Sequence, residues 1–297
     1  MAFQVLDFLR QKSLIQADFE YDVSYLNDGF WNDNYHVSGG DIDWVVKYYR
    51  QGQLTSLFPI LPDQESLALT CLKGAGIAPE PVAYFPGEHA VLIYEYWPGE
   101  HWRDEVEPVA HILRRLHRHP VSKPEGFRSL STDPEDLLAQ GDDLLSHSEQ
   151  DTLARALTEL RPSPVRVPEI STRSLLHTDV GAGNIIEGPK GIRLIDWQCP
   201  GMGDPVQDIW AFQSISFQML FDRQPLSVEQ KDLFIKAYGD SDVDRRLKTL
   251  SRYFSYRMAA YCCKRSWDLR SDDPDLSRHY QGAANAEKVQ LERELRG

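Results

Sequence analysis

Residues 175–197 read LLHTDVGAGNIIEGPKGIRLIDW, and this stretch decides which fold the rest of the chain is expected to adopt. Asp179 lies two residues after His177. Asn184 follows in the same loop, and Asp196 ends an apolar run. An aspartate that accepts a hydroxyl proton, with an asparagine and a second aspartate as oxygen ligands for Mg²⁺, is the minimal set of groups for moving a phosphoryl group from ATP. The stretch predicts Asp179 as the catalytic base and Asn184 and Asp196 as metal ligands.

The residues between Asn184 and Asp196 also predict how these two metal ligands come close together. Residues 184–187 and 192–195 are rich in residues that favour strands, and the Gly-Pro-Lys-Gly segment at 188–191 is typical of a hairpin turn. Antiparallel pairing of the two runs would return Asp196 to the end of the hairpin at which Asn184 starts.

Length and composition exclude several classes of protein. At 297 residues, 41% of them hydrophobic, the chain is long enough for two lobes or domains with a sizeable core. A net charge of −13 argues against nucleic acid or an anionic membrane as partner, and it is compatible with a cationic substrate or with simple solubility. The four cysteines lack metal-ligand spacing, and neither a membrane span nor a signal peptide is evident. We expect a cytoplasmic protein with reduced thiols.

The motif HTDVGAGN is followed by IDW and then by GDPVQD at 203–208. This series resembles the aminoglycoside phosphotransferase and choline kinase family, which has the protein-kinase-like fold. The resemblance implies a bilobal α+β fold. Residues 1–97 would form a small β-rich N-terminal lobe with an opening helix, an antiparallel sheet, one main helix and a nucleotide-covering loop. Residues 98–297 would form a larger, mostly helical C-terminal lobe with the catalytic loop, braced by Asp208, and the substrate site.

Lys47 lies in an apolar strand, where a charge is costly unless it is used. Side chains alternate along a strand, so Val45 and Lys47 share one face. The resemblance implies that Lys47 holds the α- and β-phosphates of ATP, that Val45 lines the adenine slot, and that Glu65 orients the lysine. The alternatives are an exposed lysine on an edge strand and a glutamate that serves only the dipole of its helix.

The nucleotide-covering loop would lie around Gly29. It lacks the Gly-x-Gly-x-x-Gly pattern of protein kinases and is equally compatible with an ordinary hairpin turn. Asn32 and Asn34 follow it, and either of them could donate to a phosphate.

A second hairpin is predicted for residues 81–96, and it ends at a Trp-Pro-Gly break. Protein kinases place at this break the hinge whose backbone contacts adenine. Glu95, Tyr96 and Trp97 are therefore candidates for nucleotide binding through main-chain atoms.

The second lobe offers weaker signals. His117 and His119 end a helical apolar pattern and are interpreted as surface or cap residues. The acidic segment 133–150 is typical of a solvated helix face, or it supplies carboxylates to a polycationic substrate, and residues 275–296 predict an exposed helix. Aromatic residues are interpreted mainly as core, or else as a wall for an ammonium substrate: Trp197, Trp210, Tyr256, Tyr261 and Trp267.

Thr178 stands where regulated protein kinases usually carry arginine, which disfavours a switch controlled by phosphorylation. The predicted function is ATP- and Mg²⁺-dependent transfer of the γ-phosphate to a hydroxyl of a small molecule. The acceptor would be an amino alcohol such as choline or ethanolamine, or an aminoglycoside-like compound. The alternatives are a nucleotide-binding pseudokinase without turnover and a protein kinase.

Overall fold

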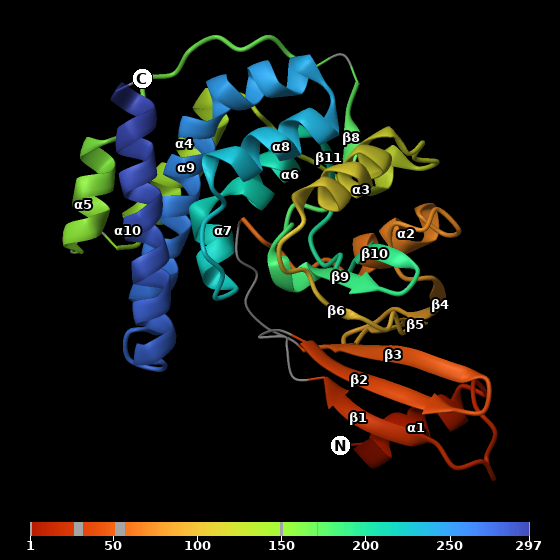
Figure 1. Ribbon diagram of the computed structural model, residues 1–297. Helices are drawn as coiled ribbons and strands as arrows, with labels where there is room; N and C mark the ends of the chain where they lie inside the picture. Colours follow the sequence, from red (N-terminus) through yellow and green to blue (C-terminus); the bar gives the residue numbers. More distant parts are fainter. Residues whose placement is uncertain (1, 27–31, 51–56, 149–150, 171, 297) are drawn as a thin grey trace. The chain divides into compact units, whose positions relative to one another are not determined.

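The computed structural model describes residues 2–26, 32–50, 57–148, 151–170 and 172–296 (Figure 1). Contacts divide the chain into two compact units: unit 1 is Met1–Glu100 with Ile186–Cys199, and unit 2 is His101–Ile185 with Pro200–Gly297. The boundary predicted from the sequence leaves residues 186–199 in the second lobe, whereas these contacts group them with the first unit. The predicted nucleotide-covering loop around Gly29 lies outside the described residues.

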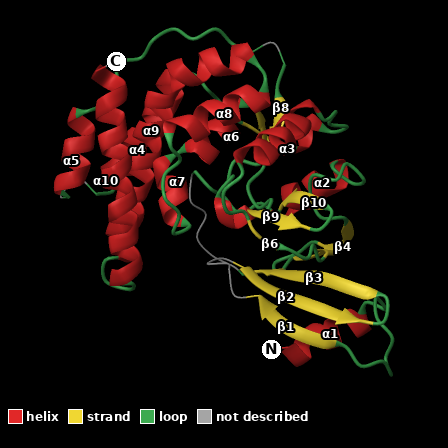
Figure 2. Cartoon of the chain, in the orientation of Figure 1, coloured by secondary structure: helices red, strands yellow, loops and turns green. Residues whose placement is uncertain are grey.

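Unit 1 is built on a five-stranded sheet with the order β1-β2-β3-β5-β4, and its paired strands are antiparallel (Figures 1 and 2). β2 and β3 form a hairpin, and so do β4 and β5, as the turn signals in the sequence predict. Two helices accompany the sheet. The elements are α1 (Ala2–Gln11), β1 (Asp22–Leu26), β2 (Asn32–Gly39), β3 (Ile42–Tyr49), α2 (Pro62–Cys71), β4 (Pro81–Phe85) and β5 (Val91–Glu95).

One face of this sheet packs against the amphipathic helix α1. Leu9 is fully buried there and belongs to a cluster with Val46 of β3 and Ile93 of β5. Because side chains alternate along a strand, Lys47 points to the face opposite Val46. The sheet therefore has an apolar face that stabilises the unit and a second face that is available for chemistry.

The hairpin predicted at 184–195 is confirmed as β9 (Ile185–Gly188) and β10 (Gly191–Leu194), which are hydrogen-bonded neighbours. β6 (Glu100–His101), which pairs with β9, lies where the chain passes from unit 1 to unit 2. A Cβ at Gly99 would clash with the carbonyl oxygen of Glu187, so this close backbone approach requires glycine.

Unit 2 is mostly helical (Figure 2), and its long helix α9 packs against α4 and α10. A small sheet of order β7-β11-β8 leads into the catalytic stretch. The elements are α3 (Val106–Arg118), η1 (Pro124–Gly126), β7 (Arg128–Ser129), α4 (Pro134–Ser146), α5 (Thr152–Glu159), β8 (Ser174–Leu176), η2 (Ala182–Asn184), β11 (Gly201–Gly203), α6 (Val206–Gln213), α7 (Ile215–Leu220), α8 (Val228–Tyr238), α9 (Ser241–Leu269) and α10 (Pro274–Arg296).

The prediction of an exposed terminal helix is wrong for one face of α10. Ala283, Ala284, Glu287 and Leu291 are buried, because the helix packs along α9 and α7. Their spacing of three and four residues is that of a helix with one buried stripe. Charged residues dominate the rest of the helix and hid this stripe in the sequence.

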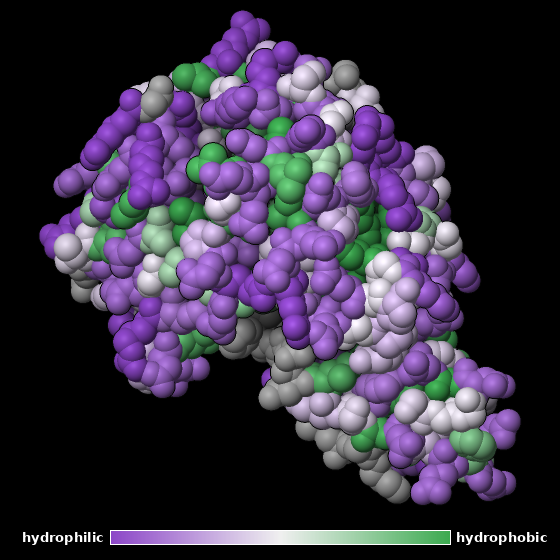
Figure 3. Space-filling model, in the orientation of Figure 1, coloured by the Kyte–Doolittle hydropathy of each residue, from purple (hydrophilic) through white to green (hydrophobic). Residues whose placement is uncertain are grey.

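Figure 3 shows a mostly hydrophilic surface on the face in view, with hydrophobic residues in scattered groups. Among the described residues, no helix combines the length and the apolar character that crossing a membrane requires.

We predict that Leu9→Ala lowers the free energy of unfolding by about 2–5 kcal/mol, because the cavity would lie between α1 and the sheet. Leu233→Ala is the control, since Leu233 also lies on a helix but is 39% exposed, and we expect it to change stability by less than about 0.5 kcal/mol. Urea unfolding followed by circular dichroism measures both. Equal effects of the two changes would contradict the packing described for α1.

Candidate functional site

The ammonium group of Lys47 is buried between two carboxylates of unit 1. Its Nζ donates to both oxygens of Glu65, at 2.8 and 2.9 Å, and to Oδ1 of Asp196 at 2.6 Å. Lys47 and Glu65 are each only 1% exposed. The predicted ion pair is confirmed, and the alternative of an exposed lysine is wrong.

Electrostatics keep this lysine charged. Burial alone would lower the pKa of Lys47, but the carboxylates of Asp196 and Glu65 outweigh it and raise the pKa above the usual value. The site thus maintains a fixed positive charge next to Asp196. Such a charge is suited to binding an anion such as a phosphate.

Tyr49 is a member of this group that the sequence analysis missed. Its hydroxyl donates to Oε2 of Glu65 at 2.6 Å, and burial raises its pKa so that the donor proton is retained. The signal was present: Tyr49 lies two residues after Lys47 and therefore on the same face of β3. Tyr49 completes the hydrogen bonding of a carboxylate that has almost no access to water.

The segment after β10 is held in place from several sides. Asp196 has a positive φ of 59°. The carbonyl of Gln198 accepts from the backbone of Leu61 at 2.8 Å, and its side chain accepts from Asn32 Nδ2 at 3.2 Å. The amide nitrogen of Asn32 is thus directed at Gln198. Trp197 is fully buried and bonds to a backbone carbonyl, so it is core.

The predicted hinge residues lie at the end of β5. The backbone N–H of Glu95 donates to the carbonyl of Glu80, and that of Tyr96 donates to the carbonyl of Asp43, each at 2.8 Å. Contacts to adenine through these two residues would therefore use their carbonyl oxygens. Val45 is buried in β3 and pairs with Tyr94. The nucleotide roles of Val45 and of the segment from Glu95 to Trp97 stay predictions.

In unit 2, Asp208 braces the catalytic loop, as predicted. This fully buried carboxylate accepts from the backbone N–H of His177 at 2.9 Å and from that of Thr178 at 2.8 Å. Thr178 has a positive φ of 70°, which is rare for a β-branched residue. Asp208 therefore fixes a strained backbone immediately before Asp179.

The interpretation of His117 as a surface residue is wrong. His117 is buried, with Nε2 3.1 Å from Oδ2 of Asp208 and Nδ1 3.0 Å from the hydroxyl of Tyr238. His117 thus positions Asp208, which in turn holds the backbone of the catalytic loop. His119, by contrast, is the C-cap of α3, as expected. No local signal separates the two histidines, because the partners of His117 are distant in the sequence.

Asp179 and Asn184 are held by the loop itself. The side-chain nitrogen of Asn184 donates to the backbone carbonyl of Asp179 at 2.8 Å, which leaves the amide oxygen of Asn184 as a metal-ligand atom. The ring of Phe221 packs against Gly181 and Gly183, and a Cβ at either glycine would clash with it. Both glycines of the motif are therefore required by packing.

The structure thus brings the predicted residues together in two groups. Lys47, Glu65 and Asp196 meet in unit 1, and Asp179 and Asn184 meet in unit 2. The donor set fits Mg²⁺, which prefers oxygen ligands, because Asp196 is one-third exposed and Lys47 occupies only one of its oxygens. The assignment of Asn184 and Asp196 as metal ligands stays a prediction.

A sequence model described as the phosphotransferase enzyme family (APH) matches residues 22–249. The chain belongs to this family. Curated thiamine kinases are similar to the chain over part of its length: that of Escherichia coli O1:K1 is 32% identical over 132 residues, or 44% of each chain. That of Shigella boydii serotype 4 is 30% identical over 139 residues. The matched region thus spans less than half of these curated relatives, at 44% and 47%.

Solved structures of other phosphotransferases have the same fold. A choline kinase from Cryptosporidium parvum has a TM-score of 0.69 at 13% identity, covering 99% of this chain and 95% of that one. A spectinomycin phosphotransferase in complex with ADP and spectinomycin has a TM-score of 0.68 at 14% identity, covering 99% of both chains. The predicted bilobal, protein-kinase-like α+β fold is confirmed.

We predict that Tyr49→Phe lowers the free energy of unfolding by about 1–3 kcal/mol, because buried Glu65 loses a donor. Tyr84→Phe is the matched control: Tyr84 also donates to a carboxylate of α2, that of Asp63, but at an exposed site. We expect it to cost less than about 1 kcal/mol. Chemical denaturation compares the two, and a larger cost for Tyr84→Phe would refute the role given to Tyr49.

We predict that Asp208→Asn impairs both stability and turnover. The amide of asparagine has one acceptor oxygen, and its NH₂ group would face a backbone N–H. We therefore expect the free energy of unfolding to fall by about 1–3 kcal/mol. In the control Asp143→Asn, the altered side chain is exposed on α4, and little change is expected. Thermal unfolding and ATP-dependent turnover are measured together. Unchanged turnover in a folded Asp208→Asn enzyme would show that the loop does not need this brace.

Proposed function

We propose that the chain is a small-molecule kinase that transfers the γ-phosphate of ATP to a hydroxyl group. The observation that carries this proposal is the buried charge of Lys47, bonded at once to Glu65 and Asp196. A buried ammonium group between two carboxylates contributes little to stability compared with apolar packing. Its retention in the core of a small sheet is explained if the charge serves to bind phosphate.

The site residues of the two units have complementary roles in this proposal. Asp179 aligns the acceptor hydroxyl and takes its proton late, since bond formation to the nucleophile is limited in a loose transition state. Asn184 and Asp196 would hold Mg²⁺, and Lys47 would hold the α- and β-phosphates. When bound, Mg²⁺ would offset the negative charge of the β- and γ-phosphates.

A cationic alcohol is the acceptor that best fits the chain. The relatives and neighbours are named as kinases of thiamine and choline and as a phosphotransferase of spectinomycin, and all three acceptors carry both a hydroxyl and a positively charged nitrogen. The net charge of −13 favours attraction of such a molecule. We propose thiamine as the first acceptor to test, with choline, ethanolamine and spectinomycin beside it.

We predict that Asp179→Asn lowers kcat by about 10²- to 10⁴-fold, because the amide cannot accept the hydroxyl proton. Asp136→Asn, in the exposed first turn of α4, is the control and should leave kcat unchanged. ADP release with each acceptor measures turnover, and circular dichroism verifies folding. Chelation of Mg²⁺ by EDTA should abolish activity in the wild type and in the control.

The same assay separates the alternatives. A pseudokinase would be stabilised by ATP with Mg²⁺ but would release no ADP with any acceptor. A protein kinase would label itself or added protein in preference to the small alcohols. Turnover that is insensitive to Asp179→Asn would refute the assignment of the base.

A further inference from the structure

The ring of Phe221 rests on the catalytic loop. Two glycines, Gly181 and Gly183, lie between the predicted base and the predicted metal ligand, and at each of them the atoms closest to an added Cβ belong to this ring. Gly181 has a φ of −91°, which any residue adopts, and Gly183 is likewise outside the left-handed region. The backbone thus allows a side chain at both positions, and the obstacle is the ring itself.

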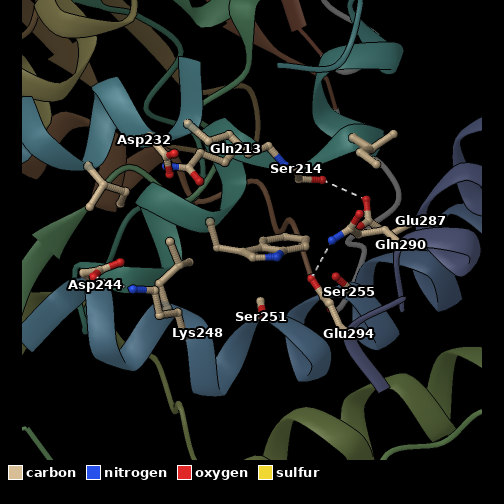
Figure 4. A pocket seen from close by; sticks show the side chains of 15 residues that line it. Gln213, Ser214, Asp232, Asp244, Lys248, Ser251, Ser255, Glu287, Gln290 and Glu294 are labelled. Atoms are coloured by element: carbon tan, nitrogen blue, oxygen red, sulfur yellow. Dashed lines mark hydrogen bonds and ion pairs between the residues drawn. The ribbon is translucent and has the colours of Figure 1, made fainter. Parts of the chain in front are cut away.

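The helix that carries Phe221 to the loop is fixed at its other end. α7 begins after Ser214, whose side chain accepts from the backbone N–H of Phe217 at 3.3 Å. Glu287 of α10, 1% exposed, accepts from the hydroxyl of Ser214 and from the backbone N–H of Ser216, both at 3.0 Å. Figure 4 shows the bond between Ser214 and Glu287 in the wall of a pocket at the start of α7. The short helix is thus tied to a long helix of the same unit.

The turn that ends α7 holds the ring in its place. The backbone N–H groups of Phe221 and Arg223 both donate to the carbonyl of Gln218, at 3.2 and 2.9 Å. Asp222, between them, has a positive φ of 55°, which aspartate tolerates better than most residues. Gln218 is fully buried, and its side chain donates to the carbonyl of Phe212 at 2.7 Å. The backbone that presents the ring is therefore anchored on both sides of Phe221.

Arg223 connects the same turn to the far end of the catalytic loop. Its guanidinium group donates to the carbonyl of Arg103 and lies over the ring of Trp102, 5.4 Å from the ring centre. The backbone N–H of Trp102, which is buried, donates to the carbonyl of Ile185 at 2.8 Å. Ile185 directly follows Asn184. The turn after α7 therefore supports the loop at its glycines directly and at its end through Trp102.

Asn184 depends on the part of the loop that the ring covers. Its backbone N–H donates to the carbonyl of Gly181 at 2.9 Å, and its side-chain nitrogen donates to the carbonyl of Asp179 at 2.8 Å. Asp208 holds the backbone immediately before Asp179. Phe221 rests on the segment that leads to Asn184. The loop thus has two supports: Asp208 serves the predicted base, and Phe221 serves the predicted metal ligand.

We propose that Phe221 is a positioning residue that fixes the side chain of Asn184 for binding a divalent ion. This role rests on the proposed function, because it takes Asn184 as a ligand of Mg²⁺. Phe221 acts through the two glycines and needs no contact with ATP or with the acceptor. A ligand that is fixed in advance loses little conformational entropy when the metal binds, so removing the ring lowers the affinity for Mg²⁺.

The contact itself is tested without ligand, by thermal unfolding of the full-length chain. We expect Gly183→Ala to lower the midpoint by about 3–8 °C, because the new methyl group overlaps the ring. In a chain that already carries Phe221→Ala the space is open, and Gly183→Ala should lower the midpoint by less than about half as much. Equal shifts in the two backgrounds would show that the ring does not press on the loop.

Metal binding is measured without turnover. Mg²⁺ is titrated into the chain with a non-hydrolysable ATP analogue, and the rise in the unfolding midpoint reports binding. Phe221→Ala should need about 10-fold more Mg²⁺ for half of this rise. Met219→Ala is the matched control and should need as much Mg²⁺ as the wild type. Met219 also lies on α7, but its terminal methyl group lies beside Gly282 of α10 instead of the loop.

Turnover adds a further readout. With the acceptors named above, kcat of Phe221→Ala should fall at limiting Mg²⁺ and recover at high Mg²⁺, which a loss of stability alone would not produce. An unchanged Mg²⁺ requirement in folded Phe221→Ala, or an equal change in Met219→Ala, would overturn the proposal. Absence of turnover in the wild type would contradict the proposed function instead, and the metal titration would still decide the role of Phe221.

Discussion

The positive charge of Lys47 is the constraint on which unit 1 depends. A lysine that is 1% exposed is tolerated only where carboxylates compensate for lost hydration. β3 therefore requires an acid from α2, Glu65, and a second one after β10, Asp196. Strands and a helix from distant parts of the sequence are tied to one ammonium group, which explains why residues 186–199 join the N-terminal unit.

The sequence predicted those parts of the site that neighbouring residues or a strong motif make recognisable. Alternation along β3 pointed to Lys47, the family resemblance pointed to Glu65 as its partner, and a Gly-Pro-Lys-Gly turn pointed to the β9–β10 hairpin. These features depend on residues close in the sequence or on a strong motif. The antiparallel sheet and the helical second unit were predictable for the same reason.

The sequence did not predict supports that join distant residues. His117 and Asp208 are 91 residues apart, so the helical pattern around His117 gave no reason to bury it. The buried stripe of α10 escaped notice because alanines carry little hydrophobic signal among many charges. A pocket whose walls come from five helices, α6 to α10, was not foreseen either, since only tertiary structure reveals how these helices pack.

Thr178 has a further consequence for the evolution of the chain. Its left-handed backbone is unfavourable for a β-branched side chain by about 1–3 kcal/mol, whereas asparagine or glycine would adopt it more readily. Selection for heat resistance alone would therefore tend to replace this threonine. The threonine at this position means that the thermal stability of the loop has not been maximised. This compromise is expected where a fixed arrangement of reactive groups matters more than resistance to heat.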